Sequence, residues 1–112
     1  MALEKLDSAQ WQSFFDRVSK GLAGKEAEIE VEGLDIGDEI EAEWIPLTGI
    51  SYDPKDNVLS IFSNDLEHMI HNPQEVWVDI GVDGLHSMEV VDKDGHKQIV
   101  VLRDELALPP PQ

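Results

Sequence analysis

The sequence predicts an α+β domain in which an N-terminal amphipathic helix packs on a bent antiparallel β-sheet of about five to seven strands. One stretch near the N-terminus repeats its apolar residues with the period of a helix. Most of the remaining chain alternates apolar and polar residues with the period of a strand, and short turn sequences divide it. With 112 residues the chain suffices for one domain with one core. The sequence leaves open whether the sheet closes into a small barrel.

The helix is expected to begin after Asp7, a residue type that often caps helix N-termini. Leu6, just before this cap, can pack on the first turn. Gly21 or Gly24 ends the helix. The apolar residues in between fall on one face: Trp11, Phe14, Phe15, Val18 and Leu22. This stripe is typical of a helix face that is buried in a core.

Two strands with glutamates on one face are expected next, over 26–32 and 39–44, with a turn over 33–38 between them. Their apolar residues share one face if Glu32 pairs with Glu39. The same register places Glu28 opposite Glu43 and Glu30 opposite Glu41.

Like charges directly opposite on neighbouring strands are destabilising, so this glutamate ladder has two interpretations. The side chains can extend into water, where salt screens them within about 8 Å. Alternatively, Glu28, Glu30, Glu41 and Glu43 form a docking surface for a basic protein or a weak face for divalent cations. Mimicry of nucleic acid also stays open, since two such rows carry about one charge per 3.4 Å.

The middle of the chain continues the sheet. Pro46 is expected to interrupt or border a strand, and the sequence over 53–57 is typical of a turn. The apolar run over 58–62 predicts a central strand that is covered on both faces. Residues 64–73 fit either a helical turn or a strand, and we favour the strand.

The C-terminal part predicts a strand over 76–80 and then a hairpin, with strands over 85–91 and 96–102. The turn over 92–95 lacks the later ligands of a calcium loop. We expect residues 1–103 to form the domain and residues 104–112, which are rich in proline, to form a flexible tail.

The chain has 24 acidic and 8 basic residues, a net charge of −16. Such a charge repels phosphates, so we expect neither nucleic-acid nor membrane binding. One explanation of the negative charge is that it keeps the protein soluble, which requires no partner. The functional alternative is that the chain binds a basic protein or a second copy of itself. Cysteine is absent, which excludes disulfides and thiolate zinc sites. No membrane span or signal sequence is recognised, and we expect a cytoplasmic protein without a cofactor.

Candidate site residues are few. His68 and His71, with Asp65, would form a metal group only on a helix, because residues three apart on a strand face opposite ways. A small metal-dependent enzyme is therefore the alternative to a non-catalytic binding module. Trp44 and Trp77 could line a groove, but burial against the helix is the favoured prediction.

Several stretches together resemble a family of short bacterial proteins known only as a domain of unknown function. They are Trp11-x-x-Phe14-Phe15-Asp16, Gly49-Ile50-Ser51-Tyr52-Asp53-Pro54-Lys55-Asp56, His68-Met69-Ile70-His71-Asn72-Pro73, and Met88-Glu89-Val90-Val91-Asp92 with Gly95 and Gln98-Ile99-Val100. The resemblance covers nearly the whole chain. It implies a stand-alone bacterial domain and carries over no catalytic residue.

Overall fold

The structure is a computed structural model that describes residues 2–22, 25–33, 37–63, 67–82 and 84–106. For residues 2, 37–43 and 104–106 it describes the backbone alone. The elements, in order, are β1 (Ala2–Leu6), a 3₁₀ turn η1 (Ser8–Gln10), α1 (Trp11–Gly21), β2 (Glu26–Gly33), β3 (Gly37–Asp53), β4 (Val58–Ser63), β5 (Glu67–His71), β6 (Pro73–Gly81), β7 (Gly84–Asp92) and β8 (Lys97–Leu106).

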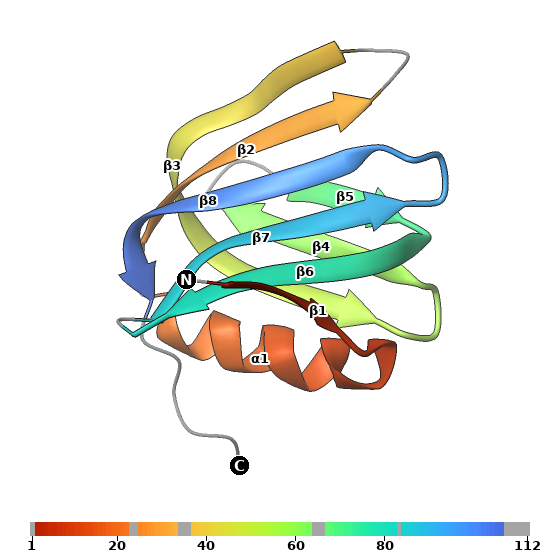
Figure 1. Ribbon diagram of the computed structural model, residues 1–112, viewed down its shortest axis with the longest axis horizontal. Coiled ribbons are helices and arrows are strands. Elements are labelled where there is room, and N and C mark those ends of the chain that lie inside the picture. Colours follow the sequence, from red (N-terminus) through yellow and green to blue (C-terminus); the bar gives the residue numbers. More distant parts are fainter. Residues whose placement is uncertain (1, 23–24, 34–36, 64–66, 83, 107–112) are drawn as a thin grey trace.

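The predicted fold class is confirmed, because one helix packs on a single antiparallel sheet (Figure 1). The sheet has eight strands rather than five to seven, in the order β1-β6-β7-β8-β2-β3-β4-β5. It does not close into a barrel, since β1 and β5 remain its two edges. No helix in the described part of the chain is long and apolar enough to cross a membrane.

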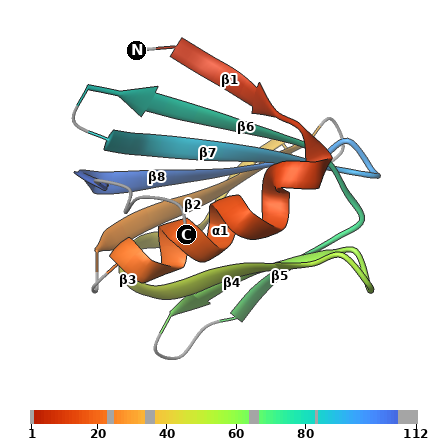
Figure 2. The same cartoon turned by 90° about the horizontal axis from the view of Figure 1, so that it is seen from below.

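Strand β3 bends the sheet into two layers. It is 17 residues long, pairs with β2 as far as Pro46 and pairs with β4 from Leu47 onwards. Pro46 therefore does not interrupt the strand; it lies where the strand changes partner, a place that tolerates a residue without an N–H group. Figure 2 shows α1 between the layer of β1, β6, β7 and β8 and the layer of β4 and β5.

The helix was predicted well. Its apolar stripe is the centre of the core, and each of these side chains is at most 6% exposed. Asp7 caps the preceding 3₁₀ turn by accepting a hydrogen bond from Ala9 N at 3.2 Å. The helix ends at Gly21, one of the two expected glycines, and Gly24 lies outside the described residues.

The N-terminal strand β1 was missed. Residues 2–6 pair with β6, with Lys5 opposite Trp77, so the helix is the second element of the chain and not the first. Its sequence, Ala2-Leu3-Glu4-Lys5-Leu6, does not alternate apolar and polar residues, and β1 lies at an edge where only one neighbouring strand constrains it.

The predicted register of the first hairpin is wrong except at Ile29, which pairs with Ala42 as expected. The turn is shorter than predicted, so Glu32 pairs with Asp38. Irregularities on either side of Ile29 shift the ladder further, and Glu30 lies opposite Ile40 instead of Glu41. This register avoids the unfavourable pairing of Glu30 with Glu41.

The predictions for the middle and the C-terminal part of the chain agree better with the structure. Asp53 Oδ1 accepts a hydrogen bond from Lys55 N at 2.9 Å in the expected turn, and Asn57 adopts a φ of 54°. Strand β4 lies between β3 and β5 with three successive buried residues, and 67–71 is a strand as favoured. The last hairpin is present as predicted, and its ladder runs from Val91 opposite Lys97 to Ser87 opposite Val101. Its second strand continues to Leu106, beyond Arg103, because β8 regains a partner at Leu85 after a register shift.

Candidate functional site

Strands β7, β8 and β2 lie side by side in the middle of the sheet. Each of them alternates buried side chains with more exposed ones, so the two sets lie on opposite faces. The buried set faces the core. On the other side, the outer row of β8 has Lys97 at one end, opposite Glu32 of β2, and Arg103 at the other, 3.0 Å from the carboxylate of Glu26. Between these two ends, five side chains form what we call the central outer face: Glu28, Glu30, Glu89, Ile99 and Val101.

Within the central outer face, carboxylates and aliphatic side chains are direct neighbours. Val101 is 37% exposed and pairs with Glu28 on β2. Ile99 lies between Glu30 on β2 and Glu89 on β7. Directly opposite residues bring their Cβ atoms to about 5 Å, so each aliphatic group has a carboxylate beside it.

Both candidate tryptophans flank this face, which corrects the prediction that they are buried against the helix. Trp77 is half-buried on the outer side of β6, because its neighbours Val76 and Val78 occupy the core side. Lys5 Nζ lies 5.9 Å from the centre of the Trp77 ring, and the indole N–H donates to Glu75 Oε1 at 3.0 Å.

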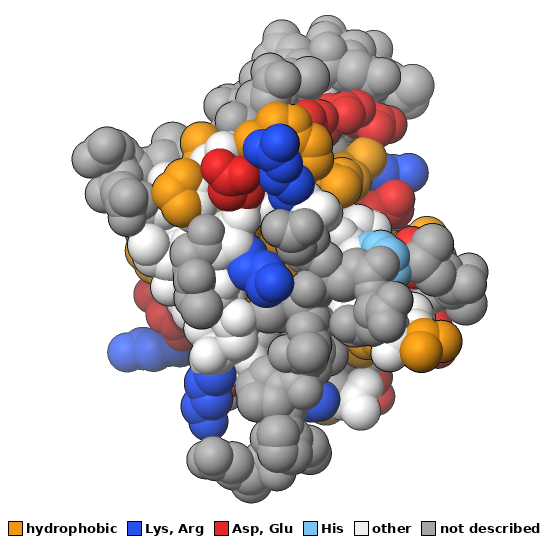
Figure 3. All heavy atoms as spheres, turned by 90° about the vertical axis from the view of Figure 1, so that its left-hand side faces the viewer, with side chains coloured by type: hydrophobic (Ala, Val, Ile, Leu, Met, Phe, Trp, Pro, Cys, Tyr) orange, Lys and Arg blue, Asp and Glu red, His pale blue; other side chains and the backbone are white. Residues whose placement is uncertain are grey.

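Trp44 is half-buried in the irregular part of β3, where its φ of 49° departs from strand geometry. The guanidinium of Arg103 lies 5.6 Å from its ring centre and donates to Glu26 Oε1 at 3.0 Å. Figure 3 views the left side of Figure 1, where a basic side chain lies over apolar groups with acidic ones beside it. Indole faces beside the central outer face thus already accept cations from the chain itself.

The two histidines of the predicted metal group have different surroundings. His68 is half-buried, and its Nε2 lies 2.9 Å from Gln98 Oε1. Because an amide oxygen can only accept, this His68 nitrogen carries the hydrogen, and Nδ1 is the ring nitrogen that keeps a lone pair for a metal. His71 is exposed, and Asp65 lies outside the described residues. The backbones of Glu41 and Glu43 belong to β3, but their side chains lie outside the description.

In the described part of the chain, one group of three acidic or imidazole side chains is compact enough to hold a metal ion. It comprises Asp92, Asp94 and His96 in the β7–β8 turn, with ligand atoms within 4.8 Å of one another. Asp92 Oδ1 accepts from the backbone N–H groups of Asp94 and His96 at 2.9 and 3.0 Å, and its Oδ2 accepts from Gln98 Nε2 at 3.2 Å. These hydrogen bonds close the β7–β8 turn, which explains why the three side chains lie close together.

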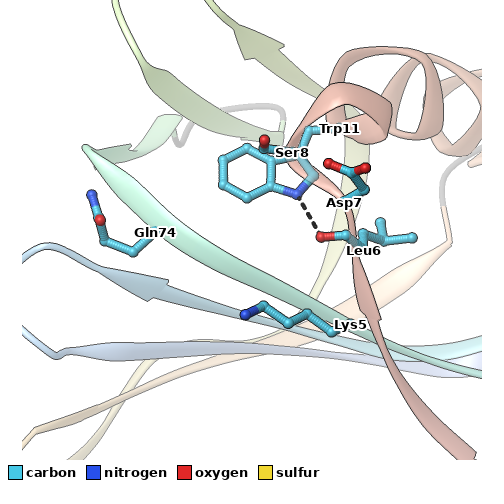
Figure 4. Close-up of a pocket in the computed structure, with 6 residues that line it drawn as sticks. All are labelled: Lys5, Leu6, Asp7, Ser8, Trp11 and Gln74. Carbon is cyan, nitrogen blue, oxygen red and sulfur yellow. Dashed lines mark hydrogen bonds between the residues drawn. The ribbon is translucent and has the colours of Figure 1, made fainter.

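A surface pocket of about 420 Å³ lies where β1 meets the helix (Figure 4). Trp11 forms one wall and donates its indole N–H to Leu6 O at 3.3 Å, while Lys5 and Gln74 lie opposite. The carboxylate of Asp7 accepts a hydrogen bond from Ala9 N at 3.2 Å and so caps the turn before the helix. The pocket therefore presents no pair of groups arranged for acid–base chemistry.

Fold and surface together define an α+β domain whose helix fills the bend of an antiparallel sheet and whose outer face is acidic and partly apolar. The chain belongs to a family of unknown function, DUF5335, whose model matches residues 2–111. It is similar to an uncharacterized protein from Aquifex aeolicus (strain VF5), at 39% identity over 110 residues, or 97% of this chain and 99% of the relative. No solved structure matches. The resemblance to a bacterial family of unknown function is thus confirmed.

Proposed function

We propose that this protein is a non-catalytic binding module whose central outer face binds a basic segment of another protein. The observation that carries this proposal is the alternation of carboxylates with aliphatic groups on three neighbouring strands. Val101, 37% exposed beside Glu28, is the best example. Binding surfaces need apolar contact for affinity and polar groups for orientation, and here both kinds of group lie on one rigid surface.

Electrostatics favours a basic partner. The chain carries a net charge of −16, which attracts a cationic segment from a distance and accelerates its association. Glu28 and Glu30 supply this charge at the surface itself, together with Glu89, which the sequence did not single out. Trp44 and Trp77 flank the proposed surface, and the roles of Glu41 and Glu43 stay a prediction from the sequence.

The two alternative hypotheses have less support. A second copy of the chain docking through this face would bring like carboxylates together, which opposes a homodimer formed in this way. A metal-dependent enzyme would need His68 and His71 to converge, but both lie on strand β5, where residues three apart face opposite ways. The binding module is therefore the function to test first.

The test is a charge reversal with a matched control. The double variant Glu28→Lys/Glu89→Lys should lose a partner that the wild-type protein captures from a bacterial lysate. The control, Asp16→Lys/Glu67→Lys, has the same change in net charge at exposed positions on α1 and β5 and should retain it. The captured protein is then purified and its Kd measured for all three forms by calorimetry. Equal affinities for the three forms, or equal losses in both variants, would contradict the proposal.

A further inference from the structure

We infer that the basic partner segment is an amphipathic α-helix that lies along β8; this inference rests on the proposed function and specifies the shape of the partner. Ile99 and Val101 are two residues apart on β8, so their side chains are about 6.7 Å apart on the same face. Residues i and i+4 of a helix rise by about 6.0 Å along its axis. An apolar stripe with this spacing can therefore contact both side chains.

The carboxylates lie where the flanks of such a helix would be. Glu28 and Glu30 run parallel to the aliphatic pair on β2, and Glu89 lies on the other side on β7. Three neighbouring strands span about 10 Å, which matches the 10–12 Å diameter of a helix with its side chains. Lysine or arginine on either side of the apolar stripe would then reach the glutamates while their own stems cover Ile99 and Val101.

An extended segment fits this face less well. Strand β8 is paired on both sides, with β7 and with β2, so its backbone has no free hydrogen-bonding edge for a further strand. A strand laid over the face would leave its own N–H and C=O groups facing side chains, whereas a helix satisfies these groups internally. An added strand would need a free edge, as at β1, at β5 or at the part of β3 before Pro46, and none of these belongs to the central outer face.

The probe for this inference is a synthetic peptide of about 18 residues, or five helical turns, with leucine at i, i+4 spacing and lysine on both flanks. A second peptide has the same composition in an order without an apolar stripe. Both are titrated against the wild-type protein, Val101→Ser, Glu28→Gln/Glu89→Gln and the control Asp16→Asn/Glu67→Gln. Fluorescence anisotropy gives Kd, circular dichroism gives the helix content of the bound peptide, and thermal midpoints verify that each variant folds.

We expect the amphipathic peptide to bind the wild-type protein at least about tenfold more tightly than the rearranged one and to gain helix content on binding. Val101→Ser should weaken only the amphipathic peptide, about fivefold, whereas Glu28→Gln/Glu89→Gln should weaken both peptides and the control neither.

Equal affinity for the two peptides, or no effect of Val101→Ser, would overturn the helical partner. If Glu28→Gln/Glu89→Gln still weakened binding in that case, the proposed acidic binding face would be supported and only the helical shape of the partner would be refuted. If that variant behaved like the control, both proposals would fall. A dimer in sedimentation equilibrium that Val101→Ser dissociates would also overturn the inference, because the occupant would then be a second copy of the chain.

Discussion

Ser19 supplies the hydrogen bonds that a neighbouring strand would otherwise give to β3. Its hydroxyl accepts from Ile50 N at 2.8 Å and donates to Ile50 O at 2.5 Å. The pairing of β2 with β3 ends at Pro46, so the side of β3 that faces away from β4 has no strand beside it at Ile50. One helix side chain thus satisfies both backbone groups and fixes α1 against the bend of the sheet.

The variant Ser19→Ala should therefore be costly. It leaves a partly buried N–H and C=O without a partner, and each such group costs about 1–3 kcal/mol, so we expect the free energy of unfolding to fall by about 2–3 kcal/mol. Urea denaturation measures this change. Ser13→Ala is the control, since the Ser13 hydroxyl is exposed and donates only to Gln10 O at 3.2 Å; it should change stability by less than about 0.5 kcal/mol. Similar losses in the two variants would refute the role of Ser19.

At the scale of elements, the buried amide of Gln98 connects the two layers of the sheet. Its side chain is 5% exposed, accepts from His68 of β5 and donates to Asp92 at the end of β7. Strand β5 is an edge strand that pairs only with β4. The contact with Gln98 is therefore a second attachment of β5 to the domain, and it opposes the opening of that edge.

The variant Gln98→Ala should loosen β5 locally. His68 and Asp92 lose a hydrogen-bond partner, and a local loss of about 1–2 kcal/mol makes backbone amides exchange roughly tenfold faster. Hydrogen exchange followed by NMR should show this increase in residues 67–71 and a smaller one in β7. Gln74→Ala provides the comparison, because Gln74 is exposed and its amide donates only to Asn72 O at 3.2 Å. Unchanged exchange in β5 would show that pairing with β4 alone holds this strand.

The elements that the sequence predicted well are those defined by local signals. The helix has an apolar stripe and follows a turn capped by Asp7, and the last hairpin has a turn that fixes its register. Strand β1 does not alternate apolar and polar residues, and the irregularities in the β2–β3 ladder depend on how β3 bends to reach β4. The same limit applies to the site. Glu28 and Glu30 could be named from alternation within one strand, but their aliphatic neighbours Ile99 and Val101 come from β8 and become visible only in the folded sheet.

For the whole molecule, repulsion between like charges opposes folding. A net charge of −16 on a compact domain with a radius of gyration of 13.0 Å keeps many carboxylates closer together than they are in the unfolded chain. The sheet moderates this locally by placing Ile99 beside Glu30 and Val101 beside Glu28. Long-range repulsion remains, and it falls as salt shortens the screening length from about 14 Å at 0.05 M to about 4 Å at 0.5 M.

Stability should consequently rise with sodium chloride. A gain of about 1 kcal/mol between these concentrations corresponds to roughly 4 °C in the thermal midpoint of a domain of this size. Sodium chloride is preferred to sulfate, because sulfate also strengthens apolar burial. A variant with three exposed carboxylates neutralised, Asp16→Asn/Asp56→Asn/Glu67→Gln, should start with a higher midpoint and gain less from salt. If salt raised both midpoints equally, or raised neither, repulsion between carboxylates would not limit the stability of the fold. The acidic surface would then lower the free energy of unfolding only slightly, with or without a basic partner bound to it.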